Sequence, residues 1–332
     1  MLEFLTLLPL LLGPPGPVET HPIVTPAKFQ TSFESSLAGK LAIPDNIKEG
    51  SLRYRYVFIG GFLNEGMSQY FKQNARELRA LGVPRAAVHY IYPSSHESVA
   101  GNADLVRGDF QEIASEGPEK LVVIAHSRGA CDALAFALQN PGFVANRVEA
   151  LFLVQGPFGG TGVADYVTGE GPPIDSLMPF PHRVVALALG RVEETRLAHG
   201  KHGGITALTR RASRAYWEMA LKENQAAIRV VGPKTFYVTA KTKPSHLGLF
   251  LKSTAFYLGA HFGPNDGMVA LDDQTVAGLG TVLAVLDAGH TDLTHRFPSA
   301  LPNRRLRRAL IDAIVMAVGR PVTVKMAASR TH

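Results

Sequence analysis

Ser127 stands where one sequence pattern ends and another begins. The apolar run from Leu121 to Ile124 predicts a buried strand, and the small and helix-forming residues from Gly129 to Leu138 predict a helix directly after it. A serine at such a sharp strand-to-helix turn has a strained backbone and needs small residues two places before and after it. Ala125 and Gly129 meet that need. The segment therefore predicts Ser127 as a nucleophile.

A serine hydroxyl is a weak nucleophile at neutral pH, so this chemistry also needs a histidine base and a carboxylate that orients it. His290 follows the predicted strand from Thr281 to Leu286, and Asp266 lies in a turn rich in Pro and Gly, residues 263–269, upstream of that strand. After a serine at a strand-to-helix turn, the acid and then the base follow along the chain. We therefore predict a triad of Ser127, Asp266 and His290.

Other side chains could replace the acid or the base. Asp287 and Asp292 lie close to His290 in the sequence but are poorly placed to reach its Nδ1. His126 occupies the variable position of the turn, where we expect its ring to line the substrate pocket. The full set of alternatives is Asp272, Asp273, Asp287 and Asp292 for the acid and His126 and His295 for the base.

The negative charge that develops when a serine attacks a carbonyl requires two backbone N–H donors, an oxyanion hole. We expect one donor from Arg128, the residue after the serine, and the other from Phe62, in the loop after an early strand. Paired glycines before Phe62 let that loop approach a substrate closely, although a simple tight turn is the alternative explanation. The residues predicted to contact the substrate are Gly61, Leu63, His126 and Phe158.

Strand and helix patterns alternate around these positions. Such alternation predicts an α/β fold, with a mostly parallel central sheet and helices on both faces. The predicted strands are residues 54–59, 87–92, 121–124, 150–154, 235–240 and 281–286, and the predicted helices are residues 68–81, 102–114, 129–138 and 304–318.

The alternation is lost between about residues 172 and 233. Apart from a short apolar run at 184–189 that resembles a strand, this stretch is rich in helix formers and carries Tyr216, Trp217 and Met219 among charges. We interpret it as a helical lid inserted between two strands of a domain that spans residues 51–320. A helical excursion that packs on the sheet is the alternative.

The two ends of the chain are expected to lie outside that domain. Residues 2–12 are nearly all apolar but lack a basic start and are too short to span a membrane. They predict either an atypical export signal or, failing that, a cytoplasmic protein. Residues 13–50 are expected to be an irregular lead-in punctuated by prolines, and residues 321–332 a tail.

Composition restricts the class of protein further. The chain has 332 residues, of which 46% are hydrophobic and 19% charged, which predicts a globular protein with a large core. The net charge of +6 is modest, and the basic residues do not form a nucleic-acid-binding stripe. A single cysteine, Cys131, excludes an internal disulfide and a cysteine metal site. Arg304, Arg305, Arg307 and Arg308 open the last helix, where they form a solvated face or attract an anionic lipid surface weakly.

Several segments together resemble the bacterial triacylglycerol lipases, which are α/β-hydrolases. In chain order they are residues 57–62, which resemble the oxyanion loop; 125–129, the Gly-His-Ser-x-Gly turn of the nucleophile; 155–165, the loop before the lid; 265–269, the Asn-Asp-Gly-x-Val loop of the acid; and 289–292, the His-x-Asp loop of the base. The resemblance implies an α/β-hydrolase fold and cleavage of small-molecule or lipid carboxylic esters through an acyl-enzyme, without a cofactor. An acyltransferase, a thioesterase or a non-catalytic binding protein on the same fold are the alternatives.

The chain also departs from the lipase pattern. Ala125 replaces the first glycine of the nucleophile turn, and Gly60 stands where the oxyanion loop usually has a histidine. Lipases of this type bind a structural calcium through one Asp just after the catalytic histidine, which Asp292 matches, and a second Asp upstream of the acid. Residues 241–246 offer no carboxylate for the second position. Because a hard cation needs several oxygen ligands, we expect no calcium and no other metal.

Overall fold

The computed structural model describes residues 24–62, 64, 69–172, 203–297 and 299–319. Four of the sequence-based expectations concern residues outside these ranges. They are the apolar N-terminal segment, the contact residue Leu63, the strand at 184–189 and the tail at 321–332.

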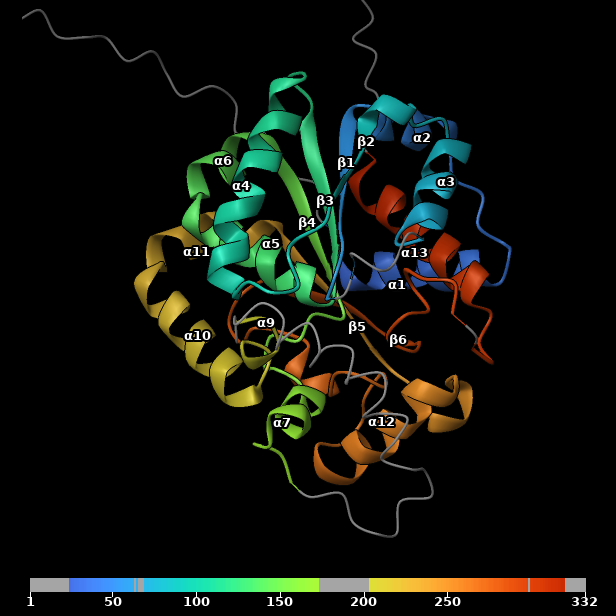
Figure 1. Cartoon of the computed structure of the whole chain (residues 1–332). Coiled ribbons are helices and arrows are strands. Elements are labelled where there is room, and N and C mark those ends of the chain that lie inside the picture. Colours follow the sequence, from blue (N-terminus) through green and yellow to red (C-terminus); the bar gives the residue numbers. More distant parts are fainter. Residues whose placement is uncertain (1–23, 63, 65–68, 173–202, 298, 320–332) are drawn as a thin grey trace, which may run out of the picture.

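The described residues form a six-stranded parallel sheet (Figure 1). The strands are β1 Tyr54–Ile59, β2 Val88–Ile91, β3 Lys120–His126, β4 Val148–Val154, β5 Thr235–Lys241 and β6 Thr281–Asp287, in the order β2-β1-β3-β4-β5-β6. All five neighbouring pairs are parallel, so the carboxyl ends of the strands lie at one edge of the sheet. The predicted α/β architecture is confirmed.

Helices cover both faces of this sheet (Figure 1). In β1, Tyr56 and Phe58 pack into one core cluster with α1 (Pro26–Leu37), α3 (Lys72–Ala80) and α13 (Asn303–Val318). Val57 and Ile59 pack into the other with α4 (Val99–Ser115) and α5 (Arg128–Gln139). This division follows from the two-residue repeat of a strand, and because both faces are covered the central strands β3 and β4 are apolar over most of their length. The helices are α1 Pro26–Leu37, α2 Asp45–Ser51, α3 Lys72–Ala80, α4 Val99–Ser115, α5 Arg128–Gln139, α6 Pro141–Arg147, α7 Gly162–Thr168, α9 Gly203–Thr206, α10 Arg210–Glu223, α11 Gln225–Val231, α12 Leu249–His261 and α13 Asn303–Val318.

The expectation of an irregular lead-in is wrong for most of residues 26–51, which form α1 and α2. Pro26 occupies the first turn of α1, where backbone N–H groups form no hydrogen bond within the helix, so the N–H that proline lacks is not needed. Thr25 caps the helix by accepting a hydrogen bond from the Lys28 N–H. Phe29 and Phe33 are buried in the core cluster that also contains α13. A proline that predicts irregular structure in isolation therefore marks a helix start here.

The described half of the predicted insertion consists of α9, α10 and α11. Trp217 and Ala220 of α10, with Ala227 and Val231 of α11, belong to the core cluster around α5. α10 and α11 therefore pack on the helix layer of the sheet, as in the alternative interpretation, whereas Ile205 of α9 packs against Ala164 of α7. A lid remains a prediction, since residues 173–202 are outside the described ranges. No helix within the described ranges is long and apolar enough to cross a membrane.

Candidate active site

Ser127 lies at the junction between the carboxyl end of β3 and the first residue of α5. Its backbone has φ 56° and ψ −133°, a conformation that is strained for any residue except glycine. The turn requires a glycine at position 129, because a Cβ there would lie 2.2 Å from the Gly60 carbonyl oxygen. The strand-to-helix turn predicted from the sequence is therefore present, and it holds the serine at the carboxyl edge of the sheet.

Ser127, His290 and Asp266 form a continuous chain of hydrogen bonds. The Ser127 Oγ lies 2.9 Å from His290 Nε2, and His290 Nδ1 lies 2.8 Å from Asp266 Oδ2. The carboxylate accepts from Nδ1–H, which leaves Nε2 free to accept the serine proton. The structure thus brings together the three predicted side chains, which are up to 163 residues apart in the sequence.

The loop around Asp266 fixes the direction of its carboxylate. Oδ1 accepts hydrogen bonds from the backbone N–H groups of Met268, at 2.9 Å, and Val269, at 2.8 Å. Oδ2 faces His290 and also accepts from the Gln155 side chain at 2.8 Å. Asp266 is fully buried, so these donors replace the water that would otherwise solvate its charge.

Gln155 is a residue of this site that the sequence analysis missed. It is the first residue after β4, with a backbone φ of 50°, and its amide also donates to the Gly289 carbonyl oxygen at 3.3 Å. It therefore links the acid loop to the loop that carries His290. Its place at the carboxyl end of a strand is the signal that could have identified it.

The alternative acids and bases form other contacts. Asp273 pairs with Arg210 and Arg214, Asp287 accepts from the Thr242 hydroxyl, and Asp292 Oδ2 accepts from the Gly289 N–H. Asp272 is exposed, and His295 packs edge-on against Tyr70. None of the hydrogen bonds and ion pairs that the structure describes for these residues reaches Ser127 or a ring nitrogen of His290.

The predicted oxyanion donors lie on two segments that meet at Ser127. Arg128 is the first residue of α5, so its backbone N–H has no partner within the helix. The loop after β1 passes so close to the serine that a Cβ on Gly61 would lie 2.8 Å from Ser127 Cβ. Asn64, which the sequence analysis missed, holds this loop by donating to the carbonyl oxygens of Gly61 and Pro93, each at 2.8 Å.

His126 does not line a substrate pocket, and this prediction is wrong. Its side chain is buried, and Nε2 lies 2.7 Å from the carbonyl oxygen of His290 while Nδ1 contacts the Tyr70 hydroxyl. Burial lowers the pKa of His126 well below its usual value, and the neighbouring His290 lowers it further. His126 is the last residue of β3, and its buried ring packs against the ring of His290, with centroids 4.8 Å apart.

Phe158 is also not placed for direct substrate contact. Its ring is buried in the core cluster around α5, against Trp217 and Tyr237. The ring packs there because residues 156–160 turn back onto α5, where a Cβ on Gly156 would meet both Phe158 and Ala130. Phe158 therefore supports the loop after β4.

The side chain of Arg128 is buried beside the serine. Its guanidinium donates to the carbonyl oxygens of Ser95 and Glu97, and it lies 3.8 Å from Asp132, one turn further along α5. Asn102 donates to the same carboxylate at 3.0 Å. Burial raises the pKa of Asp132 to about 7, since the charge of Arg128 and the Asn102 hydrogen bond only partly offset the loss of water. This network anchors the amino end of α5.

The described residues contain no group of three or more His, Cys, Asp or Glu side chains that could hold a metal ion. Cys131 is buried on α5, and burial raises the pKa of its thiol well above the usual value. Ser127 and His290 offer an oxygen and a nitrogen within hydrogen-bond distance, an arrangement suited to proton transfer and to acyl transfer.

Comparison with known proteins defines the class of fold. No family model and no curated protein sequence matches this chain. Among solved structures, a metagenomic carboxyl esterase, MGS0156, superposes with a TM-score of 0.58 and 20% identity over 80% of this chain and 76% of its own. The mature lipase BlEst2 of Bacillus licheniformis superposes with a TM-score of 0.53 and 17% identity, over 71% of this chain and 84% of its own. The chain has the α/β-hydrolase fold.

Proposed function

We propose that this protein hydrolyses carboxylic esters through an acyl-enzyme formed on Ser127. The observation that carries the proposal is the chain of hydrogen bonds from Ser127 Oγ through His290 to the buried Asp266, at 2.9 and 2.8 Å. These are the distances over which a histidine can take a proton from a serine hydroxyl. The esterase and the lipase that share the fold support the choice of an ester substrate.

The reaction proceeds in two halves. In the first, Ser127 Oγ attacks the ester carbonyl as its proton passes to His290 Nε2, and the same proton is then given to the leaving alcohol when the carbon–oxygen bond breaks. In the second, His290 takes a proton from water, which attacks the acyl-enzyme; the bond between the acyl carbon and Ser127 Oγ then breaks, the proton returns from His290 to Oγ, and the acid is released. Asp266 keeps the Nδ1 proton in place and stabilises the imidazolium.

The negative oxygen of each tetrahedral intermediate needs two fixed donors. We assign them to the backbone N–H groups of Arg128 and Phe62, on the two segments that meet at the serine. The N-terminus of α5 adds the positive end of a helix dipole at the same place. Phe62 packs beside α7 and α9, against Ala164 and Ile205, so an apolar part of the substrate would lie on this side of the serine.

The test is hydrolysis of p-nitrophenyl esters from acetate to palmitate. We expect the Ser127→Ala variant to lose roughly 10⁴-fold or more in kcat. The control is Ser115→Ala, an exposed serine at the end of α4, which should retain full activity. The chain-length optimum then separates an esterase from a lipase.

Labelling by a fluorophosphonate gives an independent answer. The wild type should be labelled once and Ser127→Ala not at all. Equal activity of wild type and Ser127→Ala would disprove the triad. Absence of both activity and labelling in the wild type would favour a non-catalytic binding protein.

A further inference from the structure

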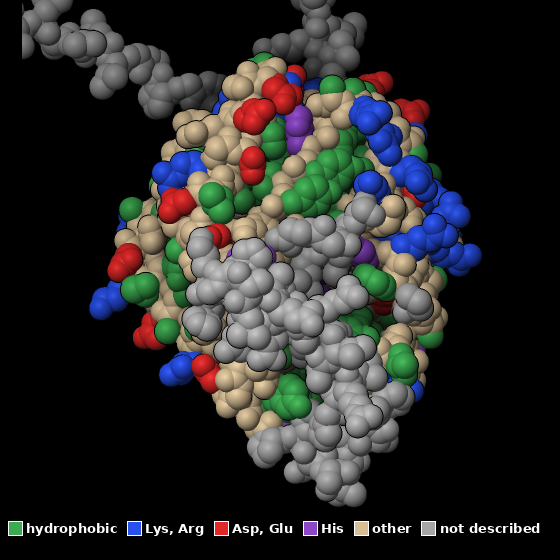
Figure 2. All heavy atoms as spheres, in the orientation of Figure 1, with side chains coloured by type: hydrophobic (Ala, Val, Ile, Leu, Met, Phe, Trp, Pro, Cys, Tyr) green, Lys and Arg blue, Asp and Glu red, His purple; other side chains and the backbone are tan. Residues whose placement is uncertain are grey.

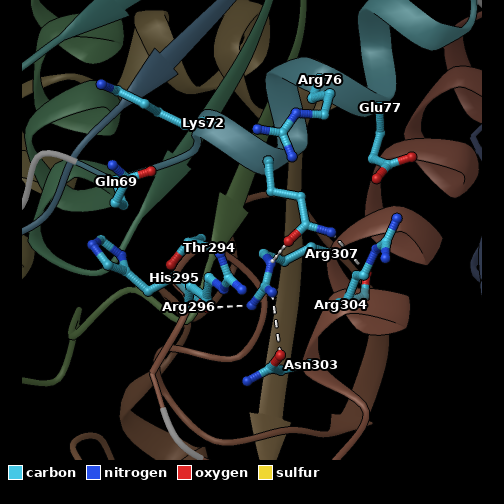
Figure 3. A pocket seen from close by; sticks show the side chains of 11 residues that line it. Gln69, Lys72, Arg76, Glu77, Thr294, His295, Arg296, Asn303, Arg304 and Arg307 are labelled. Carbon is cyan, nitrogen blue, oxygen red and sulfur yellow. Dashed lines mark hydrogen bonds between the residues drawn. The ribbon is translucent and has the colours of Figure 1, made fainter.

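A pocket of about 390 Å³ lies between α3, α13 and the loop after His290 (Figure 3). Its wall carries five cationic side chains and one carboxylate, Glu77. The cations come from three separate segments of the chain and are Lys72, Arg76, Arg296, Arg304 and Arg307. Figure 2 shows Lys and Arg side chains gathered over α3 and the start of α13.

The outer cations of the pocket have no counter-ion among the described residues. Lys72, Arg76, Arg296 and Arg304 are exposed, and none forms an ion pair with any residue that the structure describes. Like charges at this density repel one another, so the arrangement favours a bound anion that neutralises them.

Arg307 forms the inner wall and is only 1% exposed. Its guanidinium is held by the Gln73 side chain at 2.9 Å and the Asn303 side chain at 3.2 Å, and it also donates to the His295 carbonyl oxygen. Burial lowers the pKa of Arg307, and the charges of Arg296 and Arg304 add to that effect, against Asp292 and Glu77. A guanidinium fixed by neutral acceptors keeps its positive charge available to a ligand.

A second and independent feature points to a ligand. His295 lines the same pocket and is 5% exposed, and its Nε2 has no hydrogen-bond partner in the part of the chain that the structure describes. The ring is held edge-on against Tyr70, with centroids 4.1 Å apart, and stacks on Phe297 at 5.3 Å. A buried ring nitrogen without a partner is costly, and an oxygen of a bound anion would satisfy it.

The backbone also contributes to the positive potential of the pocket. Lys72 and Asn303 are the first residues of α3 and α13, and the pocket is lined by the first turns of both helices. The amino end of a helix attracts negative charge because its N–H groups are unpaired.

We propose that this pocket binds a phosphate group. The planar guanidinium groups of Arg76 and Arg304 match the oxygens of a phosphate, which can accept two hydrogen bonds from each. Arg307 adds its fixed positive charge, since Gln73, Asp292, His295 and Asn303 already accept from most of its N–H groups. The group would be either a free phosphate compound or the headgroup of an anionic phospholipid, and both would present the same oxygens. The proposal does not depend on the proposed esterase activity.

A series of side-chain contacts links this pocket to the triad. His295 contacts Tyr70, Tyr70 contacts His126, and His126 holds the His290 carbonyl oxygen. The phosphate pocket and the candidate catalytic base therefore share one chain of packed side chains.

The test is calorimetric titration of the full chain with inorganic phosphate and with pyrophosphate. We compare the wild type with the double variant Arg76→Gln/Arg304→Gln. The matched control is Arg79→Gln/Arg305→Gln, which removes the same charge from exposed positions of the same two helices that do not line the pocket. We expect saturable binding, weakened about tenfold or more in the pocket variant and unchanged in the control. Ser127→Ala should bind as the wild type does.

Two results would overturn the proposal. One is a wild type that binds none of the three probes: phosphate and pyrophosphate at about millimolar concentration, and vesicles of phosphatidylcholine with phosphatidylglycerol. The other is an equal loss of anion affinity in both double variants, which would mean that the anion is attracted by the overall positive charge of this surface.

The vesicles also identify the source of the phosphate. A lipid headgroup would be assigned if the protein co-sediments with vesicles that contain phosphatidylglycerol but not with pure phosphatidylcholine. This co-sedimentation should be lost in the pocket variant only. Binding of the soluble anions without co-sedimentation would assign a free phosphate compound.

Discussion

A hydrogen bond of 2.7 Å joins the side-chain Nε2 of His126 to the main-chain carbonyl oxygen of His290. A carbonyl oxygen can only accept, so Nε2 carries the proton and Nδ1 accepts from the Tyr70 hydroxyl. The lowered pKa of His126 agrees with this neutral form. The residue before the nucleophile thus supports the backbone of the candidate base, and the loop of His290 is tied to β3 independently of the triad.

Tyr70→Phe tests this support, because it removes the hydroxyl and keeps the ring. We expect kcat to fall about tenfold with little change in KM, and the free energy of unfolding to fall by about 1–2 kcal/mol, since His126 Nδ1 loses its partner. Ester hydrolysis and urea denaturation measure the two effects. The control is Tyr90→Phe, a ring that stacks on Phe58. Indistinguishable behaviour of the two variants would contradict a positioning role for Tyr70.

Asp266→Asn tests the orientation of His290. The amide is the same size, but it can turn its NH₂ toward Nδ1 and so favour the wrong tautomer of the ring. We expect kcat/KM to fall roughly 10³–10⁴-fold, with the fold retained by circular dichroism. Asp272→Asn, six residues away and exposed, should remain fully active. An active Asp266→Asn variant and an inactive Asp272→Asn variant would identify Asp272 as the acid instead.

The sequence was sufficient for the parallel strands and for the three residues of the hydrogen-bond chain because both depend on local patterns. Apolar runs that end at Ile124, Ala240 and Leu286 predict buried strands, and the carboxyl ends of parallel strands must meet at one edge of the sheet. Side chains in the loops after those strands therefore come together without any knowledge of the packing.

The residues that support this chain could not be predicted in the same way. Tyr70 and Asn64 act through contacts with distant loops, and nothing in their immediate sequence distinguishes them from other polar residues. Gln155 has one local signal, its place directly after a strand, but that signal does not specify its partners. The rings of His126 and Phe158 were placed in the wrong environment for a related reason. Proximity to a catalytic loop in the sequence does not determine which way a side chain points.

Gly61→Ala tests the close approach of the oxyanion loop to the serine. The new Cβ would lie 2.7 Å from the Tyr70 hydroxyl and 2.8 Å from Ser127 Cβ, so the loop must move away. We expect kcat/KM to fall about a hundredfold. The control is Gly108→Ala inside α4, where a Cβ meets nothing within 4 Å. It should retain activity and gain about 0.5–1 kcal/mol of stability. Full activity of Gly61→Ala would show that the loop does not need this approach.

The stability of the protein should depend on pH through Asp132. Its pKa of about 7 in the folded chain is above the usual 3.8, so between these values the folded state holds a proton that the unfolded state has released. Folding is therefore favoured at low pH, and this contribution is lost as the pH rises. From pH 5 to pH 8 the loss is about 3 kcal/mol.

Urea denaturation of the wild type and of Asp132→Asn at pH 5 and pH 8 measures this loss. Because the amide of the variant cannot ionise, its free energy of unfolding should fall less over this interval. The stability of the variant relative to the wild type should therefore increase as the pH rises. Asp104→Asn, on the exposed face of α4, should follow the wild type. Parallel pH dependence in the wild type and Asp132→Asn would mean that the carboxyl group is ionised beside Arg128 throughout the interval. The amino end of α5 would then be held by a buried ion pair instead of by a protonated acid.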